Sequence, residues 1–102
     1  MDEETLALFD LLMKPDLEKS DIAKLKKVAV GLYEILKQQL DAMQDFARKQ
    51  ATRDAVRIAI TNFLYDDRTG LPHSYEPNEV DIKAQAIFAH ILTRRGADFH
   101  AA

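Results

Sequence analysis

The chain of 102 residues contains no cysteine and no tryptophan, and its longest uninterrupted apolar runs are only a few residues long. Without cysteine there is neither a disulfide framework nor a thiolate metal site, so the composition favours the cytoplasm. Short apolar runs, together with an acidic rather than basic start at residues 1–4, predict neither a membrane span nor a secretory signal. We therefore expect no membrane partner.

Enzyme motifs are also missing. The three histidines, His73, His90 and His100, are far apart in the sequence, and the chain has no HExxH motif and no glycine-rich phosphate loop. The pair Asp66 and Asp67 lacks the alternating oxygen ligands and the distal glutamate of an EF-hand loop, so ordinary turn chemistry explains it. We predict no catalytic residues, no cofactor and no metal for this chain.

The residues that are present suit one globular domain. Hydrophobic residues make up 47% of the chain, enough for one apolar core at this length. The formal net charge is −3, which argues against nucleic-acid binding by the domain as a whole. The charges are uneven, however: acids gather near residues 2–21 and 66–81, and bases at 24–27, 48–57 and 94–95.

Four segments have helical periodicity, and no segment alternates apolar and polar residues for long enough to predict a strand. The sequence predicts helices over Glu3–Leu12, about Ser20–Leu40, Asp45–Leu64 and from Pro77 to about Gly96. We predict an all-α, single compact bundle-like domain of four to five helices over residues 1–96, with residues 97–102 expected to fray.

The second of these helices has the strongest pattern, with apolar residues at alternating steps of three and four. We expect it to pack against the stretch Val56–Leu64 and against the final helix, so that Leu32 and Ile60 are buried. Gly31, in the interior of the second helix, costs about 1 kcal/mol of helix propensity relative to alanine and permits a close helix crossing.

A row of basic residues occupies the third helical segment. On a helical wheel Lys49, Arg53 and Arg57 are spaced i, i+4, i+8 and share a side with the core formers Val56 and Ile60. A surface helix normally places its charges opposite its apolar stripe. This unusual placement predicts either ion pairs inside the domain or a surface that meets a partner.

Both interpretations stay open at the level of sequence. Acids such as Glu34, Asp41 or Asp45 could pair with the row, which would make it structural. Arg53, near the centre of the apolar arc, is expected not to be fully solvated. Its guanidinium should bond a carboxylate on a neighbouring helix or lie at a partner surface.

Several short motifs occur in a particular order along the chain. They are Lys26-Lys27-Val28-Ala29, Leu32 to Leu36, Phe46-Ala47-Arg48-Lys49-Gln50-Ala51-Thr52-Arg53-Asp54-Ala55-Val56-Arg57, Leu71-Pro72-His73-Ser74-Tyr75, Lys83, and Ile87-Phe88-Ala89-His90-Ile91. Over about residues 8 to 92, this order resembles the C-terminal helical domain of the R subunit of type I restriction-modification enzymes.

The resemblance implies a C-terminal fragment of a larger subunit whose nuclease and helicase-motor domains lie upstream. In that family the R subunit is an ATP-dependent DNA translocase and endonuclease. The resemblance implies that this fragment is a non-catalytic assembly module that docks the R subunit onto the modification (methyltransferase) and specificity subunits. The candidate contact residues for a protein partner, or alternatively for DNA, are Phe46, Arg48, Lys49, Arg53 and Arg57.

Overall fold

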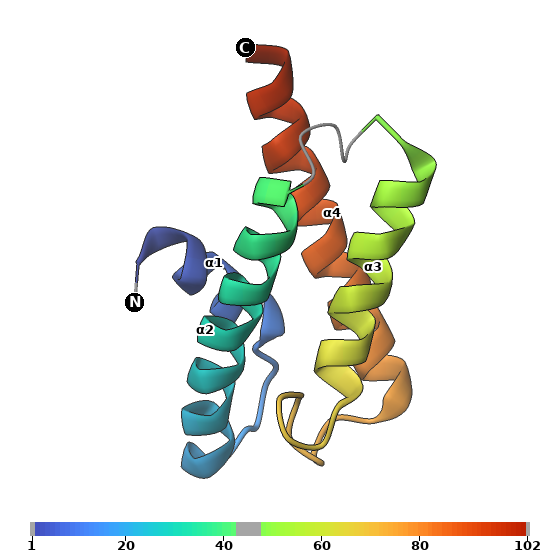
Figure 1. Cartoon of the computed structure of the whole chain (residues 1–102). Helices are drawn as coiled ribbons and strands as arrows, with labels where there is room; N and C mark the ends of the chain where they lie inside the picture. The colour runs from blue at the N-terminus through green and yellow to red at the C-terminus, as the bar shows by residue number, and fades with distance from the viewer. Residues whose placement is uncertain (1, 43–47, 102) are drawn as a thin grey trace.

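The computed structural model describes residues 2–42 and 48–101, with side chains described as far as residue 94. It contains helices α1 (Glu3–Leu12), α2 (Lys19–Ala42), α3 (Gln50–Tyr65) and α4 (Pro77–Ala101). The described residues include no strand. The predicted all-α, bundle-like domain is confirmed (Figure 1).

The helix ends follow local chemistry. The Asp2 carboxylate caps α1 by accepting a hydrogen bond from the Thr5 N–H at 2.8 Å. After α1, Asp16 has a φ of 66°, in the left-handed region that aspartate tolerates better than most residues.

Two predicted helix limits need correction. The third helix begins at Gln50 rather than Asp45: Arg48 is in a turn and Lys49 has an extended backbone, because the chain must reverse before α3 can run antiparallel to α2 (Figure 1). Residues 43–47 lie outside the described residues. At the other end of the chain, α4 continues through Gly96 to Ala101, since one glycine weakens a helix without ending it.

The four helices are arranged in a ring in which each contacts two neighbours. α1 packs most closely with α2 and α3 with α4, and further contacts join α2 to α3 and α1 to α4. No described Cα atom of α2 lies within 8 Å of one of α4. The expected packing of the second helix against the final helix was therefore wrong, because α1 contacts both and separates them.

Aliphatic side chains from all four helices fill the centre of the ring. Leu32 of α2 and Ile60 of α3 are both fully buried, as predicted. The largest fully buried side chains are Leu8, Leu12, Leu25, Leu32, Leu36, Val56, Ile60, Leu64 and Ile87.

Two glycines allow close approaches. Gly31 of α2 faces the Phe63 ring of α3, and a Cβ at position 31 would lie 3.0 Å from Phe63 Cζ, so the close approach at this glycine is made by an aromatic side chain. Gly70, in the loop after α3, is packed against backbone: a Cβ there would lie 2.1 Å from the Leu64 carbonyl oxygen. The loop can fold back under α3 only because this side chain is absent.

Truncating the core should lower stability strongly. We expect Leu32→Ala and Ile60→Ala each to reduce the free energy of unfolding by about 2 to 5 kcal/mol, because each leaves a cavity in a close-packed interior. The exposed Ile58→Ala is the matched control, since Ile58 is 53% exposed on the same helix as Ile60. Urea titrations measure all three, and losses below about 1 kcal/mol at both core sites would contradict the core assignment.

Candidate functional site

The predicted basic row is divided between the start of α3 and the turn before it. Arg48 and Lys49 are exposed and precede the helix, with Lys49 at the N-cap position. Arg53 and Arg57 follow on the first two turns of α3; Arg53 is half-buried, as its place on the apolar arc predicts, and Arg57 is exposed. Phe46 lies outside the described residues.

The hydrogen bonds seen for the two helical arginines stay within α3. Arg53 Nη2 donates to Gln50 Oε1 at 2.8 Å, and Arg57 Nη2 pairs with Asp54 Oδ1 at 3.2 Å. In place of the carboxylate expected for Arg53 on a neighbouring helix, the structure shows the amide of Gln50, one turn away at the start of α3. Exposed pairs of this kind contribute only a few tenths of a kcal/mol to stability.

The first turn of α3 has an unusual charge distribution. The side chain of Lys49, the N-cap residue, makes no capping hydrogen bond, and no acid lies in the first turn. The helix dipole makes this end positive, so acids normally stabilise it and cations destabilise it. The positive charges of Lys49 and Arg53 therefore contribute little to the stability of the domain itself.

The lysines Lys24 and Lys27 do not join this basic row. Because α2 and α3 are antiparallel, the first turns of α2 lie beside the end of α3 and not beside its start (Figure 1). Lys24 and Lys27 instead line a groove of about 540 Å³ with Arg68, in the loop after α3. The sequence did not indicate this second basic surface, because Arg68 is 41 residues from Lys27 and 44 residues from Lys24 along the chain.

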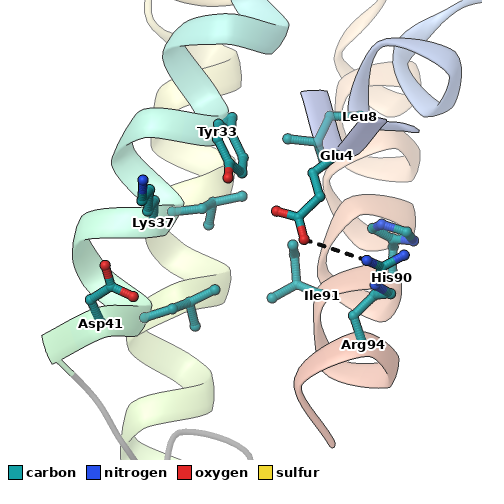
Figure 2. A pocket seen from close by; sticks show the side chains of 10 residues that line it. Glu4, Leu8, Tyr33, Lys37, Asp41, His90, Ile91 and Arg94 are labelled. Carbon is teal, nitrogen blue, oxygen red and sulfur yellow. Dashed lines mark hydrogen bonds and ion pairs between the residues drawn. The ribbon is translucent and has the colours of Figure 1, made fainter. Parts of the chain in front are cut away.

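A different groove lies between α2 and α4, beside the start of α1 (Figure 2). It exists because α1 spans only about 15 Å while its neighbours α2 and α4 are more than twice as long. Its volume is about 230 Å³, and buried Leu8 and Leu36 form part of its floor.

Charges of both signs surround the groove between α2 and α4. Glu4 of α1 and Arg94 of α4 form an ion pair at 3.4 Å on one side, while Lys37 and Asp41 project from α2 on the other (Figure 2). The half-buried His90 lies next to Arg94 on the α4 side. With acids and bases balanced, this groove has no evident preference for a ligand of either charge.

Several hydrogen bonds join the end of α1 to the loop before α4 and to α4 itself; we call this set of contacts the α1–α4 junction. The Tyr75 hydroxyl donates to the Leu12 carbonyl, and Lys83 Nζ donates to the Met13 carbonyl at 2.7 Å. These contacts satisfy carbonyls at the C-terminal end of α1 that have no partner inside the helix.

Lys14 makes a second set of contacts at the junction. Its Nζ donates to the Ser74 carbonyl at 2.7 Å and to both carboxylate oxygens of Glu79 at 3.0 and 3.1 Å. The ammonium also lies 4.6 Å from the centre of the Tyr75 ring. Isolated cations such as Lys14 and Lys83 carry no sequence signal for this role, because their partners are 60 to 70 residues away.

The junction also changes the acidity of its members. Burial, with a smaller effect from Glu79 and Asp21, raises the pKa of Tyr75 to about 12. The Glu76 N–H, and then Lys14, hold the pKa of Glu79 below its ordinary value. Shifted pKa values can mark an active site. Here each shifted group bonds backbone or an ion-pair partner within the fold, so the geometry assigns them a structural role.

Metal binding and membrane insertion would each need a recognisable arrangement of side chains. Within the described ranges, no group of three or more potential ligand side chains is placed to hold a metal ion. In the same part of the chain, none of the helices combines the length and apolar character needed to cross a membrane. His73 is exposed in the loop before α4, far in sequence from His90.

Comparison of the chain with protein-family models, with curated proteins and with solved structures finds no match.

The α1–α4 junction generates a pH prediction. A raised pKa means that folding favours the protonated Tyr75 phenol, so its contribution is fully present below about pH 10 and is lost as the pH rises through about 12. The phenolate can no longer donate to Leu12 and is repelled by Glu79. We expect the stability advantage of wild type over Tyr75→Phe to shrink across this window, as measured by urea unfolding at successive pH values.

At neutral pH, Tyr75→Phe should cost about 1 to 3 kcal/mol because a buried carbonyl loses its donor. Tyr65→Phe is the control, since Tyr65 is exposed and bonds Asp81 and the Pro77 carbonyl. Equal losses of stability in the two variants would contradict the structural role that we assign to the Tyr75 hydroxyl at the α1–α4 junction.

Proposed function

We propose that this chain is the non-catalytic assembly module of a type I restriction-modification R subunit. In this proposal it docks the ATP-dependent translocase and endonuclease subunit onto the modification and specificity subunits, in the cytoplasm. The motifs that resemble the family divide into two groups. Leu71, Tyr75, Lys83 and Ile87 build the core and the α1–α4 junction, whereas the basic residues of 48–57 lie mainly at the surface.

The observation that carries the proposal is the basic start of α3, where the N-cap residue is a lysine. Lys49 is at the N-cap position without a side-chain capping bond, and the first turn has no acid to balance Arg53. Asparagine, aspartate or serine at an N-cap would stabilise the helix more. Side chains that weaken their own helix are best explained by contacts outside the domain.

A protein partner suits these side chains well. Arginine is enriched among the residues that contribute most to protein interfaces, because its planar guanidinium makes several directed hydrogen bonds. Arg53 and Arg57 are pre-positioned by Gln50 and Asp54 and keep part of their surface accessible. A partner carboxylate placed over the start of α3 would also interact favourably with the helix dipole.

Lys49→Asp should separate stability from assembly. Aspartate at the N-cap can accept a hydrogen bond from the first turn, so we expect the free energy of unfolding to rise by about 1 kcal/mol. The same change reverses the charge at the proposed interface, so co-purification with the modification and specificity subunits should fall. Thermal melting and co-purification are measured on the same preparation.

Lys19→Asp is the matched control, because it makes the same charge change at the start of α2, away from the start of α3. It should leave co-purification unchanged. Wild-type levels of association for Lys49→Asp would contradict an interface at the start of α3. Wild-type protein that never associates with the two subunits would contradict the docking function itself.

DNA contact is the second candidate, and the same observation favours it: phosphates, like carboxylates, are attracted to the positive start of a helix with cations beside it. Phosphate contacts release counterions, so affinity for DNA falls steeply with salt. Replacing Lys49, Arg53 and Arg57 by glutamine should lower the slope of log affinity against log salt by nearly one unit per lost contact.

The DNA prediction is checked by titrating duplexes of two unrelated sequences at several salt concentrations, with Lys19→Gln as the control. Both sequences should lose affinity equally, because phosphate contacts carry no sequence information. If the slope of log affinity against log salt does not change in the variants, the basic row does not contact phosphates and a protein partner remains the explanation.

A further inference from the structure

The groove formed by α2, α3 and the loop after α3 has an apolar floor and a mainly basic rim. Gly31, half-buried Ile35 and the edge of the Phe63 ring form part of the floor. Lys24, Lys27 and Arg68 stand around it, against a single acid, Glu34. This surface is separate from the start of α3, because it lies at the opposite end of the antiparallel pair (Figure 1).

Gly31 shapes the floor of the groove. A side chain at this position would meet the Phe63 ring, whose Cζ is only 3.0 Å from where a Cβ would be. Because glycine has no side chain, the ring can lie against α2 and form part of the apolar floor below the open groove. A bulky apolar side chain from outside can enter this space and be removed from water, gaining about 25 cal/mol per Å² of apolar surface buried.

The loop holds one side of the rim in place. Asp66 Oδ1 accepts a hydrogen bond from the Arg68 N–H at 2.7 Å, and the Thr69 hydroxyl donates to the Phe63 carbonyl at 2.9 Å. The Gly70 N–H also bonds the Asp66 carbonyl at 2.7 Å. Because the backbone that carries Arg68 is already ordered, little conformational entropy is lost when a partner binds there.

We propose that this groove binds an acidic amphipathic helix of a partner protein. An apolar side chain of that helix fills the hollow over Gly31 and Phe63, while its flanking carboxylates face Lys24, Lys27 and Arg68. Three cations against one acid select for negative charge, and the apolar floor selects for a helix with an apolar face. The proposal goes beyond docking through the basic start of α3, and either surface can fail without the other.

Duplex DNA is the less suitable occupant. Duplex DNA is too wide to enter the hollow, because the hollow lies between two helices whose axes are typically about 8 to 10 Å apart. Phosphates would meet the rim lysines but leave the apolar floor uncovered, and Glu34 would repel them. The contact of apolar side chains with the floor therefore distinguishes the two kinds of partner.

The test uses the whole chain and a fluorescent helical peptide of about 14 residues, roughly four turns, with leucines along one face and glutamates beside them. Fluorescence anisotropy should show saturable binding that weakens as salt rises. Two altered peptides should each bind at least about tenfold more weakly, equivalent to about 1.4 kcal/mol. One has lysine in place of glutamate, and the other has serine in place of leucine.

Variants of the protein locate the site. Lys27→Glu combined with Arg68→Glu should weaken binding of the peptide by about tenfold or more, whereas Lys26→Glu, next to Lys27 but not lining the groove, should bind as wild type does. Gly31→Leu should block the hollow, and thermal melting shows whether it is folded. Lys49→Asp should bind the peptide normally, which separates this surface from the start of α3.

Three results would overturn the proposal. They are equal effects of Lys26→Glu and the double variant, undiminished binding of the serine peptide, and displacement of the peptide by duplex DNA with loss of DNA binding in the double variant. The last result would assign the groove to phosphate contacts. If Gly31→Leu does not fold, the two charge variants decide the outcome.

Discussion

The α1–α4 junction closes the ring of helices. Tyr75 and Lys83 supply donors to carbonyls at the C-terminal end of α1, and Lys14 bonds the loop before α4 in return. A buried helix end without partners would cost free energy for each unpaired carbonyl. With α1 held there, its leucines cover the core between α2 and α4, so the junction is where distant parts of the chain meet.

The groove between α2 and α4 and the groove between α2 and α3 are consequences of this packing. α1 is too short to fill the whole space between α2 and α4, which leaves the groove shown in Figure 2. In the other groove, between α2 and α3, Gly31 lets the Phe63 ring lie against α2 and form part of the floor. Only the second has an excess of one charge, which is why it suggests a partner of defined chemistry while the first does not.

In the proposed function, stability and binding place different demands on the start of α3. A capping residue and an early acid would make a stronger helix, yet the chain has Lys49 there and Arg53 in the following turn. The hydrogen bonds of Arg53 and Arg57 within α3 hold these side chains without joining α3 to its neighbours. Such a distribution is typical of positions that serve binding, because the missing stabilisation can be recovered in a complex.

The sequence by itself determined the four helices and the burial of Leu32 and Ile60, because periodicity is a local property. It did not determine which helices meet. Periodicity identifies an apolar face but not the helix it packs against, so the position of α1 between α2 and α4 could not be predicted. The bonds from Lys14 and Lys83, and the grouping of Arg68 with Lys24, join residues 44 to 70 positions apart. Only the tertiary structure brings such residues together, because no local preference connects them.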